Sequence, residues 1–236
     1  MIKIPILMYH SIADDNFFLS VSKKNFYNQL SFLKKLGYES INFDNLFTAK
    51  KKSFIITFDD GYKDNLINAL PILKEFNYTA TSFIVCNKIG QYNEWDKNHE
   101  MFKKKTLMSI DDINQWLSSN CHIGSHTLNH VSVKNINILN QKNEIIESKI
   151  KLSKIFNKNI NVFSYPYGKF DKSSIELVKK NFDFAVTTLR SRFDAKKHSP
   201  YLIPRIPINS NTSLFMFALK ILSIYEDVKY KNDLYL

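Results

Sequence analysis

The stretch Ser-Phe-Ile-Ile-Thr-Phe-Asp-Asp-Gly, residues 53–61, joins an apolar run to two adjacent carboxylates and a glycine. Its β-branched and aromatic residues predict a buried strand over 53–58. Asp59, Asp60 and Gly61 then indicate a tight loop at the carboxyl end of that strand. Because neighbouring side chains at a strand end point in different directions, one carboxylate can bind a metal ion while the other accepts a proton. A plain turn uses the same Asp-Gly pair, so these residues alone leave both interpretations open.

Strand-like and helix-like segments alternate along the rest of the chain. We expect strands at residues 4–9, 53–58, 79–85, 121–125, 161–165, 184–188 and 201–206. We expect helices at residues 22–36, 64–76, 109–117, 139–156, 171–181 and 213–225, the second of them kinked at Pro71. About seven strands separated by helices predict a parallel sheet, most economically a (β/α) barrel. The long polar connection 87–105 is either a lid or a surface insertion, and the unbroken rhythm predicts one domain over residues 1–236.

The composition indicates a folded protein with a sizeable core. The chain has 236 residues, of which 44% are hydrophobic, and a net charge of +11. Its lysines are spread along the chain, arginines are scarce, and no predicted helix carries a basic stripe, so we do not expect nucleic-acid binding. Cys86 and Cys121 lie in apolar, strand-like contexts and are predicted to be buried free thiols.

The distribution of apolar residues bears on the location of the protein. The apolar runs are too short to span a bilayer, and residues 1–5 lack the features of a signal peptide, so we expect a cytoplasmic protein. The predicted final helix, residues 213–225, is strongly apolar. It either makes a peripheral membrane contact or, as the simpler interpretation, packs against the barrel. The sequence does not indicate an oligomeric state.

Two histidines with a spacing of four residues form a second candidate site. His126 and His130 are the first and last residues of the stretch H-T-L-N-H. In a helix both rings would lie on one face and could bind one metal ion. Two surface histidines on a loop are the alternative. Together with one aspartate, however, they make a set of three protein ligands that leaves positions open for water and substrate. In a parallel barrel these groups, His10 and residues 165–168 would all follow strand ends and meet at the carboxyl-terminal face.

The motifs together resemble a known family. T-F-D-D-G at 57–61 and H-T-L-N-H at 126–130 are similar to the first two motifs of the polysaccharide deacetylases, carbohydrate esterase family 4. Further similar stretches are I-L-M-Y-H-S-I at 6–12, G-Y-K-D-N at 61–65 and S-Y-P-Y-G-K-F-D at 164–171, and the resemblance covers roughly residues 4–208. It implies a distorted (β/α)7 barrel that removes acetyl groups from N-acetylated or O-acetylated sugars.

The resemblance also implies roles for individual residues. Asp60, His126 and His130 would be the ligands of a divalent metal ion, with Zn²⁺ expected first and Co²⁺ or Ni²⁺ as alternatives. Asp59 would be the general base that takes a proton from the attacking water. The backbone N–H of Tyr167 would help to hold the oxyanion.

Two departures from the family pattern matter. Ser164 stands where the family usually has an arginine that orients the catalytic aspartate, and Arg205 is either its replacement or an ordinary surface arginine. The late Leu-x-x-x-His element that usually supplies the general acid is also missing, and His198 lies in a polar loop. His10 is the expected substitute, because a subset resembling the poly-N-acetylglucosamine deacetylases has a Tyr-His element there. A core histidine is the alternative.

The expected function is therefore metal-dependent N-deacetylation of an acetylated carbohydrate in a glycan or glycan precursor. Two alternatives stay open: an O-acetyl esterase acting on a polysaccharide, and an inactive carbohydrate-binding member of the fold. A lipid-linked or nucleotide-linked sugar fits the expected location better than mature cell wall. Most of the aromatic residues near the expected site must be core, and those able to stack on a sugar are Tyr9, Phe17, Phe18, Tyr62, Tyr92, Trp95 and Tyr167.

Overall fold

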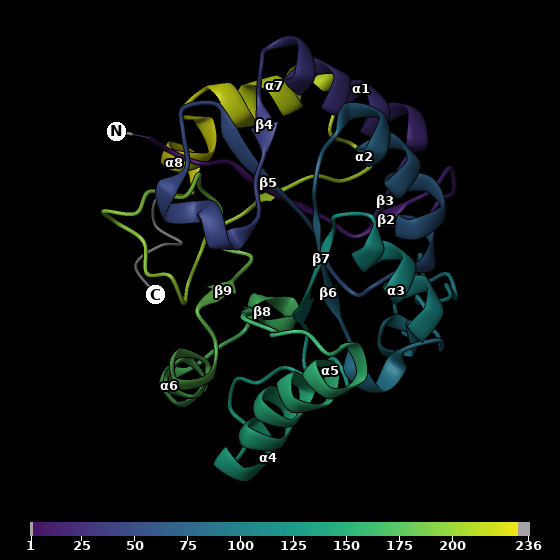
Figure 1. The fold of residues 1–236 in the computed structure, drawn as a ribbon, viewed down its shortest axis with the longest axis vertical. Coiled ribbons are helices and arrows are strands. Elements are labelled where there is room, and N and C mark those ends of the chain that lie inside the picture. The colour runs from purple at the N-terminus through teal and green to yellow at the C-terminus, as the bar shows by residue number, and fades with distance from the viewer. Residues whose placement is uncertain (1, 231–236) are drawn as a thin grey trace.

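The computed structural model describes residues 2–230 and consists of a curved parallel sheet with helices around it (Figure 1). Seven strands follow one another in the order β10-β1-β5-β6-β7-β8-β9, and all their pairings are parallel. This arrangement confirms the predicted distorted (β/α)7 barrel in a single domain. The strands are β1 (Ile6–Tyr9), β5 (Ser53–Phe58), β6 (Thr81–Ile84), β7 (His122–Ser125), β8 (Val162–Ser164), β9 (Phe184–Val186) and β10 (Ile206–Pro207).

Three short strands were not predicted from the sequence. β4 (Glu39–Ser40) pairs with the beginning of β5, and β2 (Ser11–Ile12) forms a separate pair with β3 (Ser20–Val21). Each has only two residues, which is too short for a hydrophobic period to show in the sequence.

The segment from Ile203 to Pro207 links the two ends of the sheet. Ile203 forms a parallel bridge with Val186 of β9, whereas Ile206 and Pro207 pair with β1. The strand predicted at 201–206 was therefore wrong in its bounds. Pro204 has no N–H to donate to a ladder, and the N–H of Arg205 instead bonds to Leu189 O at 2.8 Å, so the segment changes partners at this point.

Helices cover the outer face of the sheet, as Figure 1 shows. Two of the predicted continuous helices contain a π-helical turn: Asn65–Ala69 precedes α2, and Asn143–Glu147 separates α4 from α5. Pro71 lies in the first turn of α2, where its missing N–H costs little, so the predicted kink takes the form of this π turn. The helices are α1 (Lys23–Lys35), α2 (Leu70–Phe76), α3 (Ile110–Ser118), α4 (Ile138–Lys142), α5 (Ser148–Phe156), α6 (Lys172–Asn181), α7 (Leu214–Leu222) and α8 (Tyr225–Lys229).

The alternation of side chains along β5 decides which residues enter the barrel. Phe54, Ile56 and Phe58 belong to the core between sheet and helices, whereas Ile55 belongs to a separate inner cluster. Side chains of a strand alternate between its two faces, so Thr57 and Asp59 follow Ile55 on the inner side. The strand pattern therefore directs Asp59 into the barrel interior.

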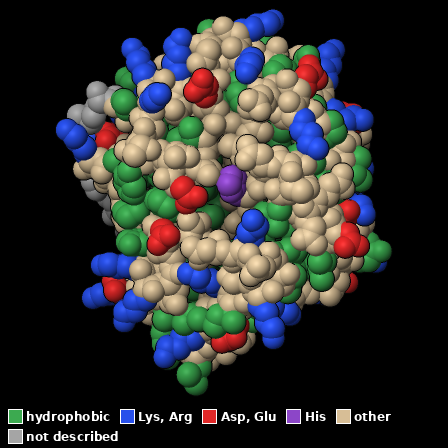
Figure 2. All heavy atoms as spheres, in the orientation of Figure 1, with side chains coloured by type: hydrophobic (Ala, Val, Ile, Leu, Met, Phe, Trp, Pro, Cys, Tyr) green, Lys and Arg blue, Asp and Glu red, His purple; other side chains and the backbone are tan. Residues whose placement is uncertain are grey.

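The final helix packs against the barrel, and its outer side is exposed. Phe217, Lys220 and Ile221 of α7 are buried, whereas Phe215 is 76% exposed. Within residues 2–230, no helix combines the length and the apolar character needed to cross a bilayer. Basic side chains are scattered among acidic and apolar ones over the face shown in Figure 2. The cytoplasmic location, the peripheral membrane contact and the lack of nucleic-acid binding stay predictions.

Candidate active site

The candidate site residues named from the sequence lie at one end of the barrel. His10 follows β1, Asp59 and Asp60 follow β5, and His126 follows β7. The carboxyl ends of parallel strands point the same way, so their following residues meet at one face. Cys86 and Cys121, predicted as free thiols, are free and buried.

Asp60, His126 and His130 form a compact group of possible metal ligands. Asp60 Oδ1 lies 3.4 Å from His126 Nε2 and 3.2 Å from His130 Nε2, and all three ligand atoms lie within 4.8 Å of one another. All three side chains are buried, and Asp60 Oδ1 has no hydrogen-bond partner among the described residues. An unpartnered buried carboxylate oxygen facing two imidazole nitrogens is costly unless a cation joins them. The donor set therefore fits a divalent ion.

Hydrogen bonds orient both imidazole rings. His126 Nδ1–H donates to Ser164 O at 2.7 Å, which leaves Nε2 free as a ligand atom. His130 Nδ1 lies 3.1 Å from the Tyr167 hydroxyl. From the sequence, Tyr167 was expected to act through its backbone N–H and by stacking on a sugar. The contact of its hydroxyl with His130 was missed because it joins residues on different loops.

The local charges shift the pKa values of the group in different directions. Burial raises the pKa of Asp60, but the His130 and His126 imidazoles outweigh burial and hold it well below its usual range. Burial lowers the pKa of His130 and prevails over the nearby carboxylates. Burial lowers the pKa of His126, but the nearby Asp60 and Asp59 carboxylates prevail over burial and raise it overall.

The backbone around the ligands is a turn and not the helix considered for H-T-L-N-H. Thr127 and His130 adopt left-handed conformations with φ of 66° and 59°, and Asp60 has φ of 74°. Such conformations cost about 1–3 kcal/mol each and are typical of functional sites. A residue of a neighbouring helical segment stabilises the turn at 126–130: the buried Glu144 carboxylate accepts hydrogen bonds from the N–H groups of Leu128 and Asn129.

Asp59 forms a fully buried ion pair with Arg205. Arg205 Nη1 donates to Asp59 Oδ1 and Nη2 donates to Oδ2, both at 2.7 Å. The guanidinium also donates to Thr187 O, to Thr57 Oγ1 and, at 3.3 Å, to Ser164 Oγ. Burial raises the pKa of Asp59, but the charge and hydrogen bonds of Arg205 outweigh it and lower the pKa overall. Arg205 therefore contacts both Asp59 and Ser164, the residue at the position where the family usually has its arginine.

His10 lies at the same end of the barrel. Its Nε2 is 3.9 Å from Asp59 Oδ2, and its side chain is 19% exposed. It is therefore close to the buried pair and still reaches solvent. His198, in contrast, is held in its own loop, where its Nδ1 accepts a hydrogen bond from Asp194 N.

Only some of the candidate aromatic residues reach the site. Tyr9 and Phe17 are almost completely buried in the core. Tyr62 is equally buried but lies near Asp60, and burial together with the Asp60 charge raises its pKa. Trp95 stacks on His130, with ring centroids 4.4 Å apart and an interplanar angle of 29°, and Tyr167 contacts the same imidazole edge-on. The connection 87–105 therefore covers the metal-ligand group with Trp95 of the 3-10 helix η4 (Glu94–Asp96).

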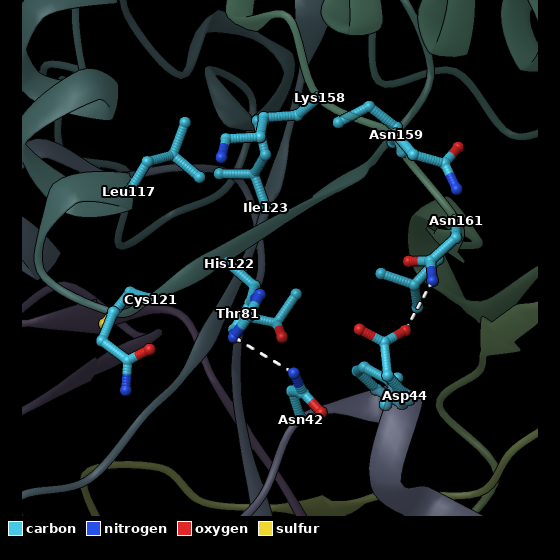
Figure 3. Close-up of a pocket in the computed structure, with 14 residues that line it drawn as sticks. Asn42, Asp44, Thr81, Leu117, Cys121, His122, Ile123, Lys158, Asn159 and Asn161 are labelled. Carbon is cyan, nitrogen blue, oxygen red and sulfur yellow. Dashed lines mark hydrogen bonds between the residues drawn. The ribbon is translucent and has the colours of Figure 1, made fainter.

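A separate polar cavity of about 450 Å³ lies at the opposite end of the strands (Figure 3). His122, the first residue of β7, lies 3.3 Å from the Asn42 amide, and Asn161 donates to Asp44 at 2.7 Å. The Asn42, His122, Asp44 and Asn161 side chains therefore have hydrogen-bond partners within the cavity wall. The cavity is therefore distinct from the metal-ligand group, which follows the other end of β7.

The fold and the site together define the class of this protein. It is a curved (β/α)7 barrel that carries, at its strand ends, a candidate divalent-metal site and a buried Asp-Arg pair. Residues 48–182, more than half of the chain, match the family described as polysaccharide deacetylase. The chain belongs to the polysaccharide deacetylase family.

Individual relatives agree with this assignment. The Bacillus subtilis protein YxkH is 30% identical over 194 residues, which cover 79% of this chain and 64% of YxkH, so the chain spans less than two thirds of that relative. A Staphylococcus aureus poly-β-1,6-N-acetyl-D-glucosamine N-deacetylase is 28% identical over 81% of this chain and 69% of its own length. The crystal structure of BC0361, a polysaccharide deacetylase from Bacillus cereus, superimposes with a TM-score of 0.80 at 29% identity, covering 92% of this chain and 68% of that one.

Proposed function

We propose that this chain is a metal-dependent hydrolase that removes acetyl groups from an N-acetylated sugar in a polysaccharide or glycan precursor. The observation that carries the proposal is the Asp60-His126-His130 group beside the Asp59-Arg205 pair in a polysaccharide deacetylase barrel. A divalent ion held by these three ligands would supply a Lewis acid that polarises an acetyl carbonyl and acidifies water. Two imidazoles and one carboxylate suit Zn²⁺, with Co²⁺ and Ni²⁺ as alternatives.

Asp59 is the proposed general base. Arg205 binds both of its oxygens, so the carboxylate is fixed in direction and stays ionised at neutral pH. Each carboxylate oxygen keeps a further lone pair that can accept a proton from the attacking water. Arg205 is in this account a positioning residue, because it acts through Asp59.

His10 is the proposed general acid. Its Nε2 lies 3.9 Å from Asp59 Oδ2, on the side of the pair that reaches solvent. From there an imidazolium can deliver a proton to the leaving nitrogen as the C–N bond breaks. The backbone N–H of Tyr167, in a left-handed conformation with φ of 58°, is the proposed donor to the oxyanion.

Two observations favour N-deacetylation over the alternatives. The Staphylococcus aureus relative carries N-deacetylase in its name, which supports an amide substrate here. The alternative of an inactive binding protein is disfavoured because Asp59, Asp60, His126 and His130 are all present and converge. An O-acetyl esterase would use the same metal group but would depend less on a general acid.

Replacing His10 by Ala tests the substrate class. An amine is a poor leaving group without a proton, so we expect the rate on N-acetylglucosamine oligomers to fall about 10²–10⁴-fold. Acetylated xylan should lose much less, because an alkoxide leaves more easily. Released acetate and free amine are measured on both substrates, with His198→Gln as the control outside the site. An equal loss on both substrates would rule out His10 as the acid, and activity on acetyl esters alone would rule out N-deacetylation.

A further inference from the structure

The backbone of His10 is held by the side chain of a buried asparagine. Asn65 Nδ2–H donates to His10 O at 2.7 Å, and Asn65 is completely buried. Asn65 is the last residue of the stretch G-Y-K-D-N at 61–65 and begins the π-helical turn Asn65–Ala69. His10 lies between β1 and β2 and belongs to neither strand, so the position of its backbone depends on contacts such as this one.

The orientation of the Asn65 amide is determined by its neighbours. Its Nδ2 faces two oxygen atoms, His10 O at 2.7 Å and Asp64 Oδ1 at 3.3 Å. Neither a carbonyl oxygen nor a carboxylate oxygen has a proton to donate. An inverted amide would bring its own oxygen against both acceptors, so the N–H groups point toward them.

Two further side chains of the same helical segment hold the residues after His10. Asp64 Oδ1 accepts a hydrogen bond from Ile12 N at 3.0 Å, and its Oδ2 accepts one from Ser11 Oγ at 2.8 Å. Asn68 Nδ2 donates to Ile12 O at 2.8 Å. These contacts fix Ser11 and Ile12 and do not bear directly on His10.

The direction of the His10 imidazole depends on its backbone. The His126 and His130 rings each have a hydrogen-bonding contact at Nδ1. The His10 imidazole has no hydrogen-bond partner within residues 2–230, and its Nε2 lies 3.9 Å from Asp59 Oδ2. A shift of residue 10 would therefore move the ring relative to Asp59 without breaking a side-chain hydrogen bond.

We propose that Asn65 is a positioning residue, which holds His10 where its imidazolium can protonate the leaving nitrogen. Asn65 contacts no reacting atom and acts through the His10 backbone. A displacement of about 1 Å in a reacting group can lower a rate by about 100-fold. This inference rests on the proposed deacetylase function and on His10 as its general acid.

Asn65→Ala and its matched control Asn68→Ala test the assignment. Each removes one N–H that donates to a backbone carbonyl, at 2.7 Å from His10 O and at 2.8 Å from Ile12 O. We expect Asn65→Ala to lower kcat on N-acetylglucosamine oligomers by about 10- to 100-fold, with little change in KM. The rate on acetylated xylan should fall much less, because an alkoxide leaves without a strong acid. Asn68→Ala should keep both rates, and both variants should keep the wild-type metal content.

Two further measurements separate positioning from a general loss of structure. In a His10→Ala background, Asn65→Ala should have no further effect on either substrate, because the imidazole that it positions is absent. A crystal structure of Asn65→Ala should show the His10 imidazole displaced while the Asp59-Arg205 pair stays in place. If Asn65→Ala does not fold, Asn65→Leu, which fills the space and lacks the donor, gives the same comparisons.

The outcomes distinguish this inference from the function on which it rests. An unchanged rate, an equal loss on both substrates, an imidazole that has not moved, or a further loss in the His10→Ala background would overturn the inference alone. A His10→Ala variant that keeps its full rate on the oligomers would overturn it together with His10 as the acid. A wild-type protein that releases no acetate from any acetylated sugar would overturn it together with the proposed function.

Discussion

Replacing Asp59 by Asn is expected to lower the rate of acetate release by about 10²–10⁴-fold while the protein keeps its metal ion. The amide cannot accept a proton from water at neutral pH. It has nearly the same shape as the carboxylate, and its oxygen can still accept a hydrogen bond from Arg205, which donates to both Asp59 oxygens at 2.7 Å. The measurement is the rate of acetate release at saturating N-acetylglucosamine oligomer, with metal content determined on the same samples.

The matched control for this change is Asp14→Asn, which alters an exposed carboxylate outside the site. It should leave both the rate and the metal content unchanged. If Asp59→Asn kept more than a tenth of the wild-type rate, Asp59 would not be the base. If the variant lost its metal ion, Asp59 would have to be counted among the ligands.

Replacing Arg205 by Met should destabilise the protein by about 3–5 kcal/mol, because it leaves the Asp59 carboxylate buried without its countercharge. The free energy of unfolding in urea measures this loss. Acetate release should fall as well, since Asp59 loses the group that fixes its direction. Lys23→Met, which removes a solvent-exposed pair with Asp14, is the control and should change stability by less than about 1 kcal/mol.

The double variant Asp59→Asn/Arg205→Met separates the two roles of the pair. With both charges removed, the penalty for an unpaired buried charge disappears, so the stability should recover in part. Activity should not recover, because the base is absent. A double variant as unstable as the sum of the single changes would show that the two residues act independently, against the geometry of the pair.

The barrel and the metal-ligand group were predictable because their signals are local. Each main strand is a short apolar run, and the alternation along β5 carries Asp59 inward and leaves Asp60 in the turn after it. His126 and His130 are four residues apart, so a turn as well as a helix can bring their rings together. The motif resemblance supplied the link between the two segments.

The parts of the site that depend on contacts between distant segments were less accessible to sequence reasoning. The Asp59-Arg205 pair joins residues 146 positions apart, and Arg205 was named only because the usual arginine is replaced by Ser164. The orientation of His130 by the Tyr167 hydroxyl and its stacking with Trp95 were missed. Nothing in the connection 87–105 distinguishes the polar residues that face the site from those that face solvent.

The most direct test of the metal-dependent mechanism is a titration of chelator-stripped protein with Zn²⁺, followed by both calorimetry and acetate release from N-acetylglucosamine oligomers. The account predicts no activity in the stripped protein and full activity at one ion per chain. His130→Ala should lose both the tight binding and the activity. Acetate release at an unchanged rate from the stripped protein, or tight Zn²⁺ binding that persists in His130→Ala, would contradict the assignment of Asp60, His126 and His130 as the metal site.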